Sequence, residues 1–324
     1  MPTTFYFTLQ IDCEATQHAV RNPALGERAV RGIGEILADT GMKATFCVIP
    51  SDMRAHARRY RSLLEEGHEI GLHVHPADLG YQEFLGVHSP EDQVRIVREA
   101  MDVFAQEMGF RPQCFTPGYY SANDHTFPVL EALGLHHGSV SVPTRNLPQC
   151  ACIWGNSSLD ARYPHRYNRC LAGDVDFVDV PATIDPDSRM WGGAHPLDLR
   201  VELVDARNHW YTINKSVQRQ LAAGENLPVK YLKAVTHNTF EFSRKDDFRR
   251  ETLLGIIRAA RDICRNAGCR LIPATTGQIA EYYRRRVPRP CGGVELKLDT
   301  RSSQKRGTMK IRNEPPGNRK DLHP

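Results

Sequence analysis

Gly67-His68-Glu69-Ile70-Gly71-Leu72-His73-Val74-His75-Pro76 is the stretch from which the fold of this chain can be read. A helical pattern ends at Gly67, and the short apolar run after it ends in two histidines. Residues i and i+2 of an extended strand face the same way, so His73 and His75 present two imidazoles to one point. Imidazole is the commonest protein ligand for zinc and also suits nickel and iron. The stretch therefore predicts a metal site at the end of a buried strand.

The bulk composition is ordinary for a globular protein. The chain has 324 residues, of which 40% are hydrophobic and 25% are charged, enough for one large α/β domain or two modest ones. No apolar stretch approaches the ~20 residues of a spanning helix, and no basic region followed by an apolar run opens the chain. Nine scattered cysteines fit reduced thiols. We therefore expect a cytoplasmic protein without a membrane span.

The net charge of +4 belongs to the C-terminal end of the chain. Residues 288–324 contain nine Lys or Arg and four Asp or Glu, which leaves 33 basic and 34 acidic residues before them. The remainder offers no basic stripe for nucleic acid. We expect residues 1–287 to form the folded domain and residues 288–324 a basic, disordered tail, because so little of the tail is apolar.

Strand and helix patterns alternate along the folded part. The expected strands are Thr4–Ile11, Ala44–Ile49, Ile70–Leu72, Gln113–Thr116, His136–Val142, Val175–Val180, Val229–Thr236 and Arg270–Ile272. This alternation predicts a parallel sheet covered by helices, an α/β fold. No Gly-x-Gly-x-x-Gly or Walker-type loop follows any strand, so no nucleotide cofactor site is expected.

Polar residues gather at the C-terminal ends of the expected strands. They are Asp12, Glu14, His73, His75, the segment 116–120, and His237. In a closed α/β barrel these ends meet at one mouth, where barrel enzymes keep their chemistry. This convergence favours a barrel over an open sheet. The long segment 143–173 is expected to be irregular and either functional or disordered.

Five segments, taken in order, resemble the motifs of the polysaccharide deacetylase family, the NodB-homology carbohydrate esterases. They are Ile11-Asp12-Cys13-Glu14, Gly67–His73, Phe115–Ser121, a faint match in Asp179–Trp191, and Val235-Thr236-His237. The resemblance runs from Thr4 to about Arg286. It implies a distorted (β/α)7-type barrel and a metal-dependent hydrolase of carbohydrate metabolism. Such an enzyme removes an acetyl or formyl group from the nitrogen of an amino sugar.

The resemblance also implies roles for individual residues. Asp12 would be the general base, and His237 the general acid that protonates the leaving amine. Glu14 and His73 would hold a divalent ion, most simply zinc, with nickel, cobalt and iron as alternatives. Asp12 and Glu14 share a face if the strand continues, so either carboxylate could be the ligand. At the turn around Tyr119, a backbone N–H could stabilise the oxyanion.

The chain departs from the family pattern in three places. Cys13 separates two acids that the family places side by side. The second metal histidine is expected at Ala77, and we expect His75 to replace it, with Asp78 in reserve. Thr116 stands where the family has an arginine that orients the catalytic aspartate.

Two arginines are candidates to replace the missing one. Arg145 and Arg162 flank or lie in the long segment 143–173, from which either could reach the mouth. A nearby cation would also keep the catalytic carboxylate charged.

Two other functions stay open. One is hydrolysis of a cyclic amide, as in the allantoinase-like branch of the same fold. The other is a catalytically silent protein that binds a glycan or a partner, which the missing arginine favours and the four retained acids and histidines oppose. The sequence leaves open which sugar, which metal and which oligomeric state apply.

Overall fold

The structure is a computed structural model that describes residues 2–202 and 206–290. Seven strands of its central sheet follow one another in the order β10-β5-β4-β3-β2-β1-β13, and β14 also pairs with β1. The bounds are β1 Thr4–Cys13, β2 Ala44–Val48, β3 Glu69–Val74, β4 Cys114–Pro117, β5 His137–Gly138, β10 Val178–Asp179, β13 Lys230–His237 and β14 Arg270–Pro273. All of these strand pairings are parallel. The sheet curls into a distorted barrel, which confirms the predicted fold class.

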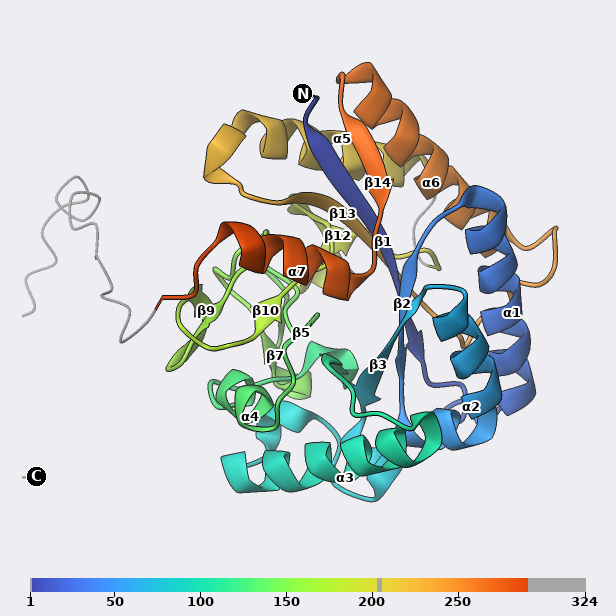
Figure 1. Cartoon of the computed structure of the whole chain (residues 1–324), viewed down its shortest axis with the longest axis vertical. Coiled ribbons are helices and arrows are strands. Elements are labelled where there is room, and N and C mark those ends of the chain that lie inside the picture. The colour runs from blue at the N-terminus through green and yellow to red at the C-terminus, as the bar shows by residue number, and fades with distance from the viewer. Residues whose placement is uncertain (1, 203–205, 291–324) are drawn as a thin grey trace, which may run out of the picture. The chain divides into compact units, whose positions relative to one another are not determined.

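Helices cover the outside of this sheet (Figure 1). In the described residues they are α1 Pro23–Thr40, α2 Pro50–Glu65, α3 Pro90–Met108, α4 Thr126–Ala132, α5 Ala206–Ala222, α6 Phe248–Asn266 and α7 Thr276–Arg286. Three short antiparallel pairs are added: β6 Asn146–Leu147 with β7 Cys152–Ile153, β8 Pro164–His165 with β9 Asn168–Ala172, and β11 Ile184–Met190 with β12 His195–Asp198. Within the described ranges, no helix combines the length and apolarity that crossing a bilayer requires.

Local sequence accounts for the helix ends. Ser89 precedes α3, where its hydroxyl accepts a hydrogen bond from the backbone N–H of Asp92 at 3.2 Å. Pro90 occupies the first helical position, where no N–H is needed. Gly109 ends the helix at φ 84°, a left-handed conformation that glycine adopts without strain. The predicted tail falls outside the described residues except for its first three.

Two expected strands are much shorter than predicted. Only His137–Gly138 of segment 136–142 and Val178–Asp179 of segment 175–180 pair in the sheet. The carboxylate of Asp179 accepts the main-chain N–H of Val140 at 3.0 Å, and it also accepts the hydroxyl of Ser141 at 2.5 Å. A side chain therefore takes the place of a neighbouring strand, which the apolar pattern of this segment could not reveal.

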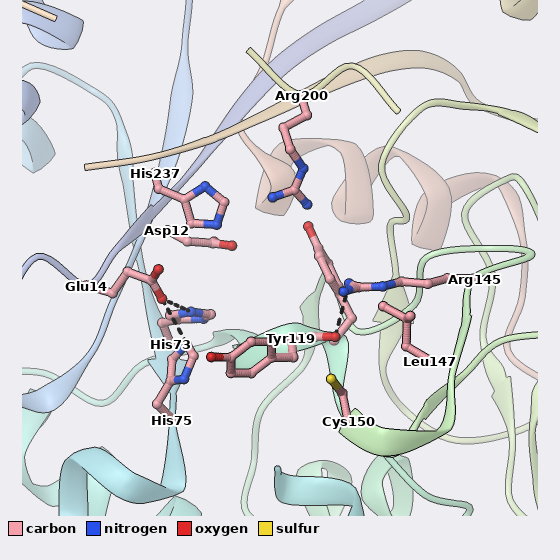
Figure 2. A pocket seen from close by; sticks show the side chains of 11 residues that line it. Asp12, Glu14, His73, His75, Tyr119, Arg145, Leu147, Cys150, Arg200 and His237 are labelled. Atoms are coloured by element: carbon pink, nitrogen blue, oxygen red, sulfur yellow. Dashed lines mark hydrogen bonds and ion pairs between the residues drawn. The ribbon is translucent and has the colours of Figure 1, made fainter. Parts of the chain in front are cut away.

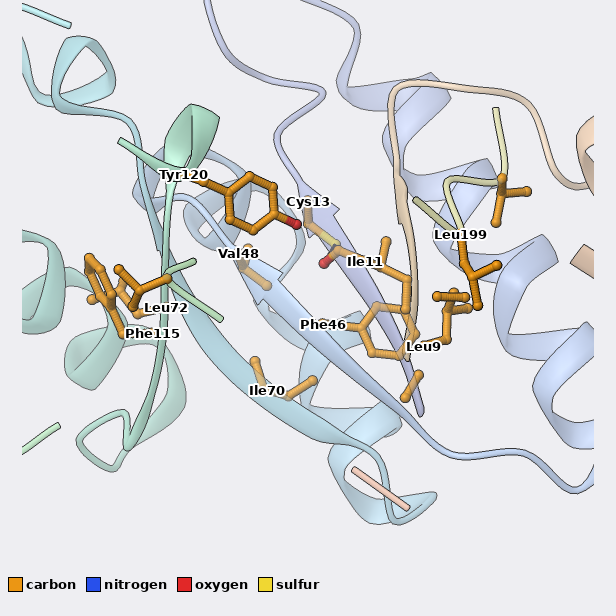
Figure 3. Packing of buried hydrophobic residues seen from close by; sticks show 14 of the residues in the cluster. Leu9, Ile11, Cys13, Phe46, Val48, Ile70, Leu72, Phe115, Tyr120 and Leu199 are labelled. Atoms are coloured by element: carbon orange, nitrogen blue, oxygen red, sulfur yellow. Dashed lines mark hydrogen bonds between the residues drawn. The ribbon is translucent and has the colours of Figure 1, made fainter. Parts of the chain in front are cut away.

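The longest strand, β1, carries apolar and polar side chains in alternation. Leu9 and Ile11 belong to the main apolar core between sheet and helices (Figure 3). Gln10 and Asp12 are also buried, at 1% and 5% exposure, but they lie on the opposite face. The period of two places Glu14, one residue beyond the strand, on the same side as Asp12, and both line one pocket. The intervening Cys13 points into the core.

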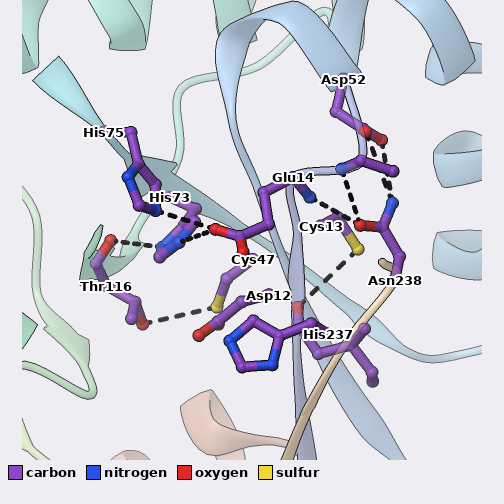
Figure 4. A network of polar contacts seen from close by, with 12 residues as sticks. Asp12, Cys13, Glu14, Cys47, Asp52, His73, His75, Thr116, His237 and Asn238 are labelled. Atoms are coloured by element: carbon purple, nitrogen blue, oxygen red, sulfur yellow. Dashed lines mark hydrogen bonds and ion pairs between the residues drawn. The ribbon is translucent and has the colours of Figure 1, made fainter. Parts of the chain in front are cut away.

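A buried amide fixes the end of β1 (Figure 4). The side-chain oxygen of Asn238, which follows β13, accepts the main-chain N–H groups of Glu14 and Ala15 at 2.7 and 2.9 Å. Its nitrogen donates to Asp52 at the start of α2, at 3.3 Å. One side chain therefore joins β1, β13 and α2 and determines where Glu14 leaves the strand.

We expect Asn238→Ala to lower the free energy of unfolding by about 2–4 kcal/mol, because it leaves two buried N–H groups without their acceptor and removes one of the donors to Asp52. Urea unfolding followed by circular dichroism measures this loss. The matched control is Asn266→Ala at the exposed end of α6, which we expect to change stability by less than ~0.5 kcal/mol. Equal effects of the two substitutions would contradict a structural role for Asn238.

Candidate active site

Glu14, His73 and His75 meet at the C-terminal ends of β1 and β3. Oε2 of Glu14 lies 2.8 Å from Nε2 of His75 and 3.4 Å from Nε2 of His73. The exposed fractions are only 9% for Glu14, 2% for His73 and 4% for His75. Figure 2 shows the carboxylate directed at both rings. One oxygen and two nitrogens of the kinds that bind zinc therefore converge.

The outer contacts of the two rings fit a metal site. Nδ1 of His73 lies 2.9 Å from the carbonyl oxygen of Thr116. A carbonyl can only accept, so Nδ1 carries the proton and the lone pair of Nε2 faces the cluster. Nδ1 of His75 lies 3.4 Å from Oε1 of Glu83, the carboxylate–histidine arrangement typical of metal ligands. The donor set therefore suits a divalent ion with three protein ligands and open positions for water and substrate.

The charge of Glu14 agrees with this assignment. Burial alone would raise the pKa of this carboxyl, but its close contacts with the imidazoles of His73 and His75 hold its pKa well below the usual range. A metal ligand must be deprotonated, and Glu14 meets that condition at neutral pH.

Gly118 allows His75 to lie where it does. This glycine follows Pro117, the last residue of β4, and opens the short 3-10 turn Gly118–Tyr120. A Cβ built on Gly118 would lie 2.6–2.7 Å from three atoms of the His75 ring, closer than any side chain tolerates. Tyr119 then adopts φ 58° and places its ring edge-to-face against His75, with centroids 5.2 Å apart. The backbone N–H of Tyr119 as an oxyanion donor stays a prediction.

Asp12 lies beside the three-residue cluster, outside the set of converging ligand atoms. Its Oδ1 accepts a hydrogen bond from the side-chain amide of Gln10 at 2.8 Å. Thr116, where an arginine was expected, is fully buried with Oγ1 3.5 Å from the sulfur of Cys47. The group that orients Asp12 is therefore Gln10, two residues earlier on the same strand face, and sequence reasoning missed it.

His237 ends β13 and faces a buried carboxylate. Its Nδ1 lies 2.6 Å from Oε1 of Glu202, whose other oxygen accepts the hydroxyl of Thr236 at 2.9 Å. Burial would lower the pKa of His237, but the charge and hydrogen bond of Glu202 raise it to about 9. The imidazole is therefore protonated at neutral pH, as a general acid must be.

Arg200 belongs to the same buried network. Its Nη1 lies 3.5 Å from Glu202, and its Nε lies 3.4 Å from Asp198. Burial would lower the pKa of this guanidinium, yet the carboxylates of Asp198 and Glu202 raise it, and Asp12 adds to the effect. The segment is held against β13, because the N–H of Val201 donates to the carbonyl of Val235 at 3.1 Å.

The structure brings the six residues predicted for catalysis or metal binding to one pocket, whereas the reserve ligand Asp78 lies outside it and accepts the N–H of Ser51 at 2.9 Å. Its lining, shown in Figure 2, includes Asp12, Glu14, His73, His75, Tyr119 and His237 together with Arg145 and Arg200. The volume is about 320 Å³, at the small end for ligand sites. These side chains thus lie around one pocket, while their roles in catalysis and metal binding stay predictions.

The structure separates the two candidates, Arg145 and Arg162, for the arginine that is missing at Thr116. Arg145 lines the pocket. Arg162 was a wrong choice, because it lies 3.3 Å from Asp179 and donates to the carbonyl of Leu171 at 2.7 Å, away from the site. Asp179, in the faint fourth motif, accepts hydrogen bonds from Val140 and Ser141 after β5. The carboxylate beside His237 is that of Glu202.

Asp198, Arg200 and Glu202 escaped the sequence analysis although they leave a signal. Charged residues alternate there with Leu199 and Val201, both fully buried, which is the period-two pattern of a strand with one polar face. The pattern spans only five residues between less regular segments. It identifies an extended segment, but it does not show that the polar face meets His237.

Comparison with known proteins agrees with this geometry. The sequence profile of the family described as polysaccharide deacetylase matches residues 23–138, which confirms the resemblance over the segment that contains His73 and His75. No curated protein sequence matches the chain at a significant level.

Solved structures extend the likeness to the whole barrel. A protein from Mycobacterium smegmatis, provisionally assigned as a polysaccharide deacetylase, is 16% identical with a TM-score of 0.57, over 91% of this chain and 96% of its own. The Puue allantoinase is 13% identical with a TM-score of 0.59, covering 88% and 91% of the two chains. A provisionally assigned polysaccharide deacetylase from Pseudomonas aeruginosa is 13% identical with a TM-score of 0.59, over 88% of this chain and 92% of its own. At these identities the likeness shows a shared fold.

We expect Gly118→Ala to weaken zinc binding at least ~10-fold, because the added methyl group displaces the ring of His75 while every ligand stays in the chain. Isothermal titration calorimetry of the metal-free protein with zinc measures this affinity. Gly155→Ala is the matched control, since a Cβ there meets no atom within 4 Å. Unchanged affinity in Gly118→Ala would remove His75 from the ligand set.

We also expect Glu202→Gln to move the basic limb of the pH–rate profile to lower pH. The carboxylate stabilises the imidazolium, so its removal lowers the pKa of His237 from about 9 towards the ordinary 6.5, and the acid loses its proton earlier as pH rises. The profile of kcat/KM between pH 6 and 10 tests this, with the exposed Glu281→Gln as control. An unmoved limb would show that His237 is not the group that titrates.

Proposed function

On the premise of a polysaccharide deacetylase fold, we propose that this protein is a metal-dependent hydrolase that removes an acetyl or formyl group from the nitrogen of an amino sugar. One observation carries the proposal. The Glu14 carboxylate and two imidazoles converge in a buried pocket whose other walls hold a second carboxylate, Asp12, and a protonated histidine, His237. Amide hydrolysis needs a Lewis acid, a base for water and an acid for the leaving amine, and this pocket has a candidate for each.

A divalent ion held by Glu14, His73 and His75, which we propose is zinc, would polarise the acyl carbonyl and make a bound water more acidic. The remaining work falls to the side chains. Asp12, oriented by Gln10, accepts the proton of the attacking water. His237 donates its proton to the departing amine nitrogen, and Glu202 keeps it charged until then. The geometry favours Glu14 over Asp12 as the metal carboxylate, because only Glu14 reaches both imidazoles.

The test is acid release from a panel of N-acetyl and N-formyl amino sugars, with allantoin included for the cyclic-amide alternative. We expect the zinc-loaded protein to release acetate or formate and the chelated protein to be inactive until zinc is restored. Asp12→Asn should lower kcat by about 10²–10⁴-fold, because the amide cannot accept the proton. Its zinc content should stay that of the wild type.

The exposed Arg95→Ala on α3 serves as control and should keep wild-type activity. Release of acid from allantoin alone would replace the sugar substrate by a cyclic amide. If the zinc-loaded wild type hydrolyses nothing on the panel, a silent glycan- or partner-binding protein becomes the better account.

A further inference from the structure

Two guanidinium groups approach the pocket from the wall opposite the Glu14–His73–His75 cluster. Figure 2 shows Arg145 and Arg200 directed into the pocket from that side. Both are buried, with exposed fractions of 4% and 8%, and both line the cavity. Two buried guanidinium groups at one wall concentrate positive charge on that side of the pocket.

The two arginines have different surroundings. Arg200 is balanced by Asp198 and Glu202 on its own segment, at 3.4 and 3.5 Å. Arg145 donates from Nη1 to the carbonyl of Tyr119 at 3.1 Å, and its Cζ lies 5.7 Å from the centre of the Tyr120 ring. Both guanidinium groups help to lower the pKa of the buried Asp198 carboxyl, and Arg145 in addition contacts the aromatic wall formed by Tyr119 and Tyr120.

The wall that carries Arg145 is held in a strained conformation. Thr144, immediately before it, has φ 66°, and both Tyr119 and Tyr120 also have positive φ values, 58° and 56°. A β-branched residue rarely adopts this region. Among the described residues only six non-glycines do so, and the other three are Arg21, Phe84 and Ala151. Phe84 packs edge-to-face against Tyr119 with ring centres 5.1 Å apart, so the strained residues gather around this wall.

One buried residue, through its main chain and its side chain, maintains this conformation. Trp154 accepts the N–H of Thr144 at 3.1 Å and donates its own N–H to the carbonyl of Arg145 at 2.8 Å. Its indole N–H donates to the carbonyl of Tyr120 at 2.9 Å. Strained residues that the surrounding structure holds in place are typical of ligand sites. These contacts fix the backbone of Arg145 at the pocket wall, and the hydrogen bond from its Nη1 to Tyr119 positions the guanidinium.

We propose that Arg145, assisted by the field of Arg200, binds an oxyanionic group of the substrate, a carboxylate or a phosphate, while the acyl amide faces the Glu14–His73–His75 cluster. A guanidinium fork matches both oxyanions in geometry and charge. The cavity of about 320 Å³ suits one small acylated unit. This inference rests on the proposed hydrolase function and narrows its substrate to a small, negatively charged N-acyl amino compound.

Three probes that share one acyl group test the proposal: a neutral N-acetylhexosamine, its 6-phosphate and the corresponding uronic acid. Binding is measured by calorimetry and turnover by acetate release, each on the zinc-loaded protein. We expect one anionic probe to bind at least ~10-fold more tightly than the neutral one. Which of the two does so distinguishes phosphate from carboxylate.

Arg145→Ala should remove this preference, and Arg145→Lys should keep part of it, because a lysine retains the charge without the planar fork. Arg95→Ala is the control and should keep the full preference. The comparison of probes on the wild type needs no variant, so it decides the matter even if Arg145→Ala fails to fold.

The outcomes separate the two proposals. Equal binding of all three probes by the wild type overturns the inference, even if all three are hydrolysed. If Arg145→Ala keeps the full preference for an anionic probe over the neutral one, the inference is overturned as well. Tight binding of an anionic probe without acetate release supports the oxyanion site and contradicts the hydrolase.

Discussion

The alternation of side chains along β1 is the constraint on which the site depends. One face of this strand supplies the core with Leu9 and Ile11, and the other carries Gln10, Asp12 and then Glu14 towards the pocket. Spacing by two keeps all three polar residues on one side. Gln10 can therefore hydrogen-bond to Asp12, and Glu14 can reach the two histidines. Cys13 between the acids is therefore no defect. It belongs to the apolar face, and the Asp-x-Glu spacing delivers two carboxylates to the same space.

Parallel pairing converts this local pattern into a site. The register sets Asp12 beside His237 on β13 and Cys47 on β2, and the next strand, β3, brings its two histidines to the same edge. Asn238 then closes the gap between strand ends by accepting two main-chain N–H groups. The catalytic candidates thus come from strands, which hold positions more rigidly than loops, while the opposite wall comes from the irregular segment 143–173 and its neighbours.

The sequence predicted the part of the molecule that rests on periodic patterns. The strands, the helices and the residues at the strand ends follow from alternation and capping, so Asp12, Glu14, His73, His75 and His237 could be named. What it could not supply is the partner of each. Gln10 as the support of Asp12, and Glu202 as that of His237, depend on contacts between side chains that no spacing rule encodes. The choice of Arg162 failed for the same reason. Its position in the loop does not show that its guanidinium pairs with Asp179 instead of reaching the pocket.

Trp154 gives the pocket an optical reporter of its own. Its indole is fully buried and hydrogen-bonded to the wall at Tyr120, whereas Trp210 on α5 is half exposed. A buried indole emits at shorter wavelength than a solvated one, so the two populations differ in colour and in access to soluble quenchers. In a Trp191→Phe variant, which removes the third tryptophan of the chain, changes at the short-wavelength edge of the emission therefore follow the wall beside Arg145 during a titration, with no label attached to the protein.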